Sequence, residues 1–152
     1  MKLGLITAIC EGMTFEEVVD FAAENGLECL EVACWPQGGA QRRYAGVSHI
    51  DVANLDEEKA NDIKNLCAKK GVEISALAYY PNTLDPDLEK RQSYIAHLYK
   101  LIDASAMLDV NMITTFIGRV PTKNFSENLE IVKEVWPPIL EYAQKKGVKV
   151  AI

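Results

Sequence analysis

Short apolar runs alternate along the chain with longer stretches in which apolar residues recur at every third or fourth position. The short runs predict strands, and the longer stretches predict amphipathic helices that cover them. The five predicted strands are Leu3–Ala8, Cys29–Trp35, Glu73–Tyr80, Asn111–Ile117 and Val148–Ile152. One helix is predicted between each strand and the next, so the pattern indicates a chain built of βα units.

Capping residues set the starts of the predicted helices. The first begins after Thr14, whose hydroxyl can form a capping box with Glu17. The others run from Asp56 to Cys67, from about Pro86 to Met107 and from Ser126 to Lys146. Pro137 and Pro138 lie inside the fourth helix, and we expect them to kink it or to split it in two.

The predicted helices also end alike. Gly26, Gly71 and Gly147 each stand between a polar helix end and the next strand, and Asp109 takes the same place after the third helix. Glycine suits the left-handed conformation that commonly closes a helix. Because this punctuation recurs about every 40 residues, it indicates an internal βα repeat.

Strict alternation of strands and single helices predicts parallel strands joined by right-handed crossovers. Two α/β architectures have this form, an open doubly wound sheet and a closed (βα)8 TIM barrel. An open sheet usually carries a glycine-rich phosphate loop after its first strand, and Ala8–Gly12 does not match one. The barrel is therefore favoured, while the open alternative predicts nucleotide or anion binding near Ile9–Met13.

A TIM barrel needs eight βα units and typically about 250 residues. This chain supplies four units and a fifth strand, so residues 1–152 are predicted to form the N-terminal half of one barrel domain. The final strand, Val148–Ile152, has no polar tail after it, although a parallel strand is normally buried on both faces. We therefore expect a half barrel whose remaining strands come from further sequence or from another chain.

Composition narrows the functional classes. The 16 Lys and Arg against 22 Asp and Glu give a net charge of −6, which disfavours nucleic-acid and anionic membrane surfaces as partners. The four cysteines form no CxxC pair, as expected of reduced thiols in a cytoplasmic protein. The N-terminal run lacks a signal-peptide pattern, and no apolar stretch approaches the roughly 20 residues that span a bilayer.

In a barrel, chemistry lies where strands end and the following loops begin. The loop from Trp35 to Asn54 is unusually long, which favours a functional role over simple packing. Within it, Arg42 and Arg43 could clamp a phosphate or carboxylate or could be solvated surface charges. His49 has no ligand partner at metal spacing and is interpreted as an ordinary histidine. Trp35 could stack on the apolar face of a sugar or cap the core.

The next strand ends add further candidates for a sugar-binding pocket. Tyr80, Asn82 and Phe116 could form half of a polyol site, because an amide and a hydroxyl can bind sugar hydroxyls beside an apolar ring. Arg119 follows Phe116 closely and joins the predicted substrate-binding set. Glu31 lies in the second strand on the face opposite Leu30 and Val32, so inside a barrel its carboxylate must find a partner.

Three segments resemble one family. The runs Ala76–Asn82 and Thr115–Arg119 and the ending Lys146–Ile152 are similar to the sugar phosphate isomerases and epimerases of the xylose isomerase-like barrel superfamily. The resemblance extends along the whole chain in order and spacing. It implies a small-molecule sugar substrate and a divalent metal, commonly Mn²⁺ or Mg²⁺, that polarises a ketose while carboxylates move a proton between neighbouring carbons.

The resemblance also implies where the catalytic groups lie. The family's metal ligands are Glu, Asp, His and Glu at the ends of strands five to eight, and the first would follow Ile152. No catalytic or metal-ligating residue is therefore assigned to this chain, which on its own is predicted to be an inactive part of the substrate pocket.

Two alternatives stay open. The superfamily includes apurinic endonucleases with histidine ligands in this half, but Tyr80–Asn82 and Phe116–Gly118 contain no histidine, and the acidic charge also disfavours DNA. A half barrel could instead be a folding unit without catalytic activity. Because a half barrel exposes the edges of its first and last strands, we expect this chain to form a homo-oligomer or to pair with the missing half barrel.

Overall fold

The computed structural model describes residues 1–36 and 46–152. Within them, five parallel strands pair in the order β1-β2-β3-β4-β5. The strands are β1 Gly4–Ile6, β2 Cys29–Ala33, β3 Glu73–Ala78, β4 Met112–Thr114 and β5 Lys149–Ala151. The order never reverses, as it would in a doubly wound sheet, so the open alternative is excluded. Sequential pairing is the topology of half a TIM barrel and confirms the predicted fold class.

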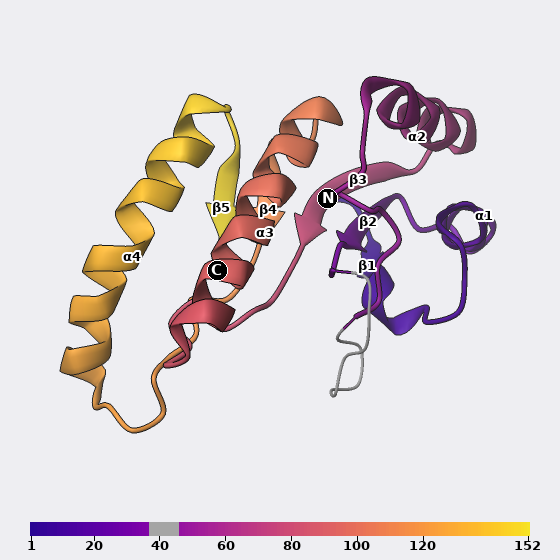
Figure 1. Cartoon of the computed structure of the whole chain (residues 1–152). Coiled ribbons are helices and arrows are strands. Elements are labelled where there is room, and N and C mark those ends of the chain that lie inside the picture. The colour runs from indigo at the N-terminus through magenta and orange to yellow at the C-terminus, as the bar shows by residue number, and fades with distance from the viewer. Residues whose placement is uncertain (37–45) are drawn as a thin grey trace.

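Helices fill the connections between the strands. They are α1 Phe15–Glu24, α2 Glu57–Lys70, α3 Leu88–Met107 and α4 Phe125–Lys145, and a short 3-10 helix, η1 Thr7–Ile9, follows β1. α1 lies beside α2 and α3 beside α4 along the outer side of the sheet (Figure 1). Among the described helices, none combines the length and the apolar character needed to cross a membrane.

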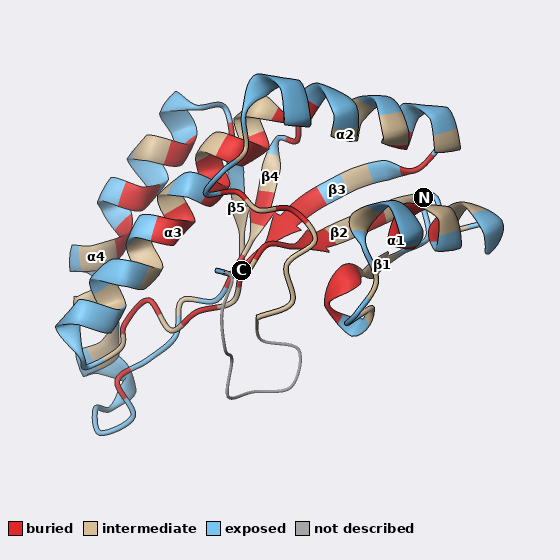
Figure 2. Ribbon diagram, turned by 45° about the vertical axis from the view of Figure 1, so that its right-hand side comes forward, coloured by how far each residue is buried: buried red, intermediate tan, exposed pale blue. Residues whose placement is uncertain are grey.

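The hydrophobic core lies between the sheet and these helices. Leu30, Val32 and Leu77 of the sheet are fully buried, as are Val18 of α1 and Leu98 of α3. The buried residues of the helices form stripes on the side that faces the sheet, while the opposite sides of the helices are exposed (Figure 2). Burial of these stripes supplies the main stabilisation, at about 25 cal/mol per Å² of apolar surface.

The inner face of the sheet carries small and polar residues. Glu31 pairs in register with Ala76, and Ala78 pairs with Thr114. A register shift between Leu30 and Glu31 leaves Ser75 as an extra residue of β3. Because side chains alternate along a strand, this bulge turns Leu77 toward the core and brings Tyr80 to the inner face.

Several element boundaries differ from those predicted. Every strand is shorter than expected: β1 ends at Ile6 because η1 begins there, and β4 covers only Met112–Thr114. α3 begins at Leu88 rather than near Pro86, because the side chain of Asp87 caps it. Of the two effects expected of Pro137 and Pro138, splitting of the fourth helix does not occur, since α4 is continuous through both.

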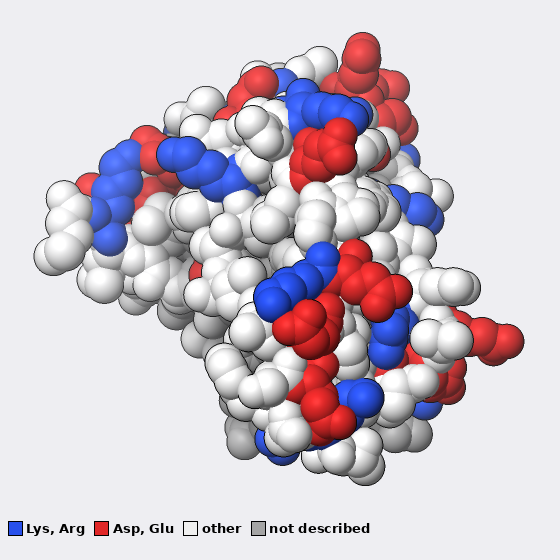
Figure 3. Space-filling model, turned by 90° about the vertical axis from the view of Figure 1, so that its left-hand side faces the viewer, with Lys and Arg blue, Asp and Glu red and all other residues white. Residues whose placement is uncertain are grey.

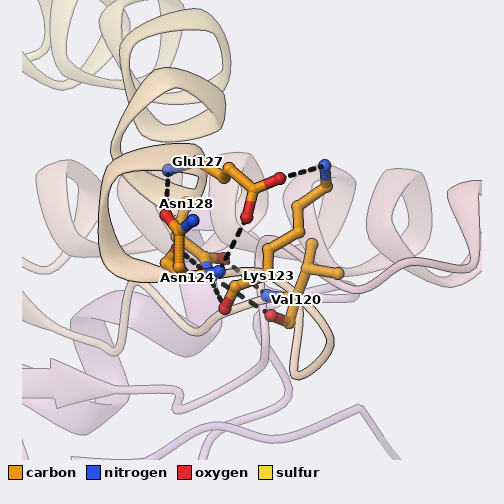
Figure 4. A network of polar contacts seen from close by, with 5 residues as sticks. All are labelled: Val120, Lys123, Asn124, Glu127 and Asn128. Carbon is orange, nitrogen blue, oxygen red and sulfur yellow. Dashed lines mark hydrogen bonds and ion pairs between the residues drawn. The ribbon is translucent and has the colours of Figure 1, made fainter.

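The predicted caps are present. Thr14 and Glu17 form the capping box of α1, and Gly71 closes α2 in the left-handed conformation. Asp109 has a φ of 59°, so it does take the position that glycine holds in the other units. At the start of α4, Asn124 and Glu127 form a second capping box, around which Asn128 binds the preceding loop (Figure 4).

Candidate substrate pocket

Three polar side chains from separate strands meet on the inner face near its carboxyl edge. The Glu31 carboxylate on β2 accepts a hydrogen bond from the Tyr80 hydroxyl, just after β3. The same carboxylate oxygen lies 3.0 Å from Oγ1 of Thr114 on β4, which donates to it. The Tyr80 and Thr114 oxygens are 3.1 Å apart. Glu31 thus has the partners that its position inside a barrel was predicted to require.

Burial controls the protonation of the Tyr80 hydroxyl. It raises the pKa of Tyr80 to about 12, and the hydrogen bond to Glu31 acts in the same direction. The hydroxyl therefore stays protonated at neutral pH and serves as a donor. The Phe116 ring contacts the Tyr80 ring, with centroids 4.6 Å apart, and is 57% exposed. Glu31, Tyr80, Thr114 and Phe116, here called the inner-face cluster, place polar oxygens beside an accessible apolar ring.

Trp35 lies apart from the inner-face cluster. Its ring meets the edge of Tyr79 at a centroid distance of 4.9 Å, and Tyr79 meets His97 of α3 at 4.6 Å. Tyr79 is 1% exposed and belongs to the core between sheet and helices. Of the two roles open to Trp35, these contacts favour capping the core.

Asn82 and Arg119 are adjacent, but the contact runs through the backbone of Arg119. The Asn82 amide donates to the Arg119 carbonyl at 2.9 Å, and its Oδ1 accepts from the Arg119 amide at 2.8 Å. The Arg119 side chain is exposed and forms no ion pair with the described residues. Residues 37–45 contain no acidic residue that could pair with it.

The long loop is only partly described. Arg42 and Arg43 lie outside the described residues. After the gap, Ser48 forms an antiparallel bridge with Cys34, and Ile50 and Val52 are buried in the core. His49 is half-buried, and burial lowers its pKa, so it is neutral at pH 7. The part of the loop that returns to the sheet therefore contributes to packing.

Thr114 was not among the predicted site residues. It is the last residue of β4, with Phe116 two positions later on the same face. The alternation of a strand could have identified it, because a residue two positions before Phe116 points the same way. Its neighbour Thr115 is 1% exposed and faces the core instead.

Metal-ligating side chains are scattered over the described part of the chain. Across residues 1–36 and 46–152, no three His, Cys, Asp or Glu side chains gather as a metal site requires. Residues 37–45 contain none of these residue types. All four cysteines are free thiols, and burial raises the pKa of Cys67 to about 11, which makes it a poor ligand at neutral pH.

Charges on the helical surface alternate in sign. Figure 3 shows basic and acidic side chains side by side on one face, without a basic patch. Along α4, Lys133 pairs with Glu130 and Lys145 with Glu141. A nucleic-acid surface requires a continuous cationic face, which this side of the molecule does not offer.

Known proteins share this architecture. A family model described as xylose isomerase-like TIM barrel matches residues 19–152. The Bacillus subtilis protein YfiH, which is uncharacterized, is 28% identical over 149 residues, corresponding to 93% of this chain and 44% of YfiH. The chain thus spans less than half the length of that relative.

Solved structures agree on the fold. D-psicose 3-epimerase from Clostridium cellulolyticum H10, solved with D-tagatose, superposes with a TM-score of 0.70 at 19% identity, over 99% of this chain and 51% of the epimerase. The IolI protein, solved with a bound zinc atom, gives 0.69 at 15% identity, over 99% of this chain and 50% of IolI. At these identities the likeness shows the fold, and the chain corresponds to about half of each barrel.

Proposed function

The chain belongs to the xylose isomerase-like TIM barrel family, and from this premise we propose that the protein is a sugar isomerase or epimerase. In this proposal, the described half provides part of the substrate pocket. The substrate class is a ketose or a related polyol, free or phosphorylated. A cytoplasmic location is part of the proposal, because all four cysteines are free thiols.

The inner-face cluster is the observation that carries the proposal. Glu31 receives hydrogen bonds from Tyr80 and Thr114 on one carboxylate oxygen. An ionised carboxylate has about four acceptor sites, so its other lone pairs can accept from sugar hydroxyls. The exposed ring of Phe116 offers an apolar surface to the C–H face of a sugar ring.

The residues of this chain would bind and orient the sugar. Tyr80 stays neutral and holds the Glu31 carboxylate in place, since a hydrogen bond to an ionised acceptor is among the stronger ones. Arg119, exposed and without an ion pair among the described residues, can contact a hydroxyl or a phosphate of the substrate. A divalent metal, Mn²⁺ or Mg²⁺, would supply carbonyl polarisation from ligands outside this chain, so no step is assigned to it here.

Turnover of ketohexoses by the protein at its full natural length tests this function. D-Fructose, D-tagatose and D-psicose are incubated with the protein and Mn²⁺ or Mg²⁺, and the products are separated by chromatography. We expect interconversion of at least one sugar. No conversion of any of the three, or of their phosphates, would falsify the proposal.

A matched pair of variants tests the inner-face cluster. Glu31→Gln should lower kcat/KM about 10- to 100-fold, because a hydrogen bond to a charged group contributes roughly 1.5–3 kcal/mol. Glu73→Gln is the control, since this exposed residue pairs with Lys2 at the opposite end of the sheet. Equal activities for the two variants would exclude Glu31 from the pocket.

A further inference from the structure

The Asn82 side chain uses both ends of its amide within the protein. Oδ1 accepts from the backbone N–H of Arg119 at 2.8 Å and of Leu84 at 3.2 Å, while Nδ2 donates to the Arg119 carbonyl at 2.9 Å. The bonds to Arg119 connect the loop after β3 with the loop after β4. A side chain with these partners has little capacity left for a sugar hydroxyl.

The backbone of Gly118 is shaped to admit this side chain. Its φ is +80°, and a Cβ atom built there would lie 1.9 Å from Asn82 Oδ1 and 2.8 Å from Asn82 Cα. A third hydrogen bond joins the same two loops, because the fully buried Thr83 hydroxyl donates to the Ile117 carbonyl at 2.6 Å. We call these contacts of Asn82, Thr83, Ile117, Gly118 and Arg119 the loop latch.

The loop latch fixes the segment that carries two of the proposed substrate contacts. Phe116 precedes the latched residues directly, and Arg119 is held by both its N–H and its carbonyl. The backbone of Arg119, from which the side chain extends, cannot shift without breaking two hydrogen bonds to Asn82. A displacement of about 1 Å at a substrate contact can cost up to 100-fold in rate.

We propose that Asn82 is a positioning residue that acts on the substrate through Arg119, and is not itself a ligand of the sugar. This inference rests on the proposed function. The sequence suggests that the Asn82 amide binds sugar hydroxyls, whereas this inference gives it the role of positioning Arg119.

A double-mutant cycle on the full-length protein tests the assignment. Asn82→Ala and Arg119→Gln are made singly and together, and binding of D-fructose, D-tagatose and D-psicose is measured by calorimetry alongside kcat and KM. Arg119→Gln removes the guanidinium but keeps the backbone groups that Asn82 binds. We expect Asn82→Ala to weaken binding about tenfold in the wild type and less than about threefold in the Arg119→Gln background.

Other outcomes overturn the inference in distinct ways. Equal losses in both backgrounds would make Asn82 an independent ligand of the sugar. Unchanged binding with lower unfolding stability would leave it a purely structural role. A wild-type protein that neither binds nor converts any of the sugars removes the proposed function and this inference with it.

Because Asn82→Ala could prevent folding, a second variant that keeps part of the hydrogen bonding is also measured. Asn82→Asp keeps an oxygen for the Arg119 and Leu84 amides but loses the donor to the Arg119 carbonyl. Its binding should fall between wild type and Asn82→Ala. Binding as weak as that of Asn82→Ala, with wild-type stability, would contradict positioning through the Arg119 amide.

Discussion

His97 shows how burial sets the charge of a single residue. Its ring is 8% exposed and donates from Nε2 to the Cys34 carbonyl at 2.8 Å, which fixes α3 to the end of β2. Burial lowers the pKa of His97, so the ring is neutral in the folded protein at pH 7. Burial also lowers the pKa of His49, the residue interpreted from the sequence as an ordinary histidine, and keeps it neutral at pH 7.

The lowered pKa of His97 predicts a loss of stability in acid. In the unfolded chain, His97 binds a proton near its ordinary pKa of about 6.5, whereas in the folded protein it does so only at lower pH. The free energy of unfolding therefore falls as the pH drops below about 6.5. His97→Gln keeps a donor for the Cys34 carbonyl and cannot titrate. Urea unfolding at pH 7.5 and pH 5.0 should therefore show a larger loss for the wild type than for His97→Gln.

His49 is present in both proteins, so its titration cancels in that comparison. If the free energy of unfolding had the same pH dependence in both proteins, His97 would bind its proton equally well in the folded and the unfolded state, and the prediction would be wrong.

At the scale of elements, a polar network of Val120, Lys123, Asn124, Glu127 and Asn128 surrounds the start of α4 (Figure 4). Asn128 Oδ1 accepts from the Val120 amide at 2.7 Å, and Nδ2 lies within 3.3 Å of the carbonyls of Val120, Lys123 and Asn124. These bonds satisfy backbone groups of the loop that leads from the inner face to α4. The loop between β4 and α4 is thus held at its start by the loop latch and at its end by Asn128.

Loss of the Asn128 amide should destabilise the protein. We expect Asn128→Ala to lower the free energy of unfolding by about 1–3 kcal/mol, because partly buried backbone groups lose their partners. Asn128→Asp should be at least as harmful, since it brings a carboxylate oxygen toward three carbonyls. Glu130→Ala is the control on the same helix, where only an exposed pair with Lys133 is lost, at a cost of roughly 0–1 kcal/mol.

Thermal and urea unfolding of the three variants would measure these differences. An Asn128→Ala variant as stable as the Glu130→Ala control would mean that water replaces the amide without cost.

At the scale of the whole molecule, the described sheet has two unpaired edges and an open inner face. β1 and β5 each pair with one neighbour only in the described residues. Phe116 is 57% exposed on the inner face, and Ile152 is 69% exposed beside β5. Unpaired strand edges next to apolar surface are templates for association.

We therefore predict that the 152-residue chain, produced alone, self-associates at micromolar concentration. Sedimentation velocity should show dimers or larger species. Ile152→Lys should weaken the association, because a charge at an edge strand opposes edge-to-edge pairing while the exposed position tolerates it in the fold. A well-folded monomer at up to about 100 µM would contradict the prediction.

The order of elements, the capping box of the first helix and the fold class follow from the sequence alone. These features depend on residues near one another in the chain, as in the capping box of Thr14 and Glu17 or the left-handed position of Asp109. The family resemblance agreed with the half-barrel topology that the structure shows. Element boundaries were less accurate, because η1 and the Asp87 cap replace the ends of longer predicted elements.

Contacts between side chains of different elements depend on the tertiary structure. The bulge at Ser75 turns Tyr80 inward, and it arises from the pairing of β3 with β2. Glu31 and Thr114 are 83 positions apart, so the alternation within either strand could not reveal their hydrogen bond. The hydrogen bond from the Asn82 amide to the Arg119 carbonyl, 37 positions later, was equally invisible in the sequence. Such contacts depend on how distant segments pack, which no local pattern of residues encodes.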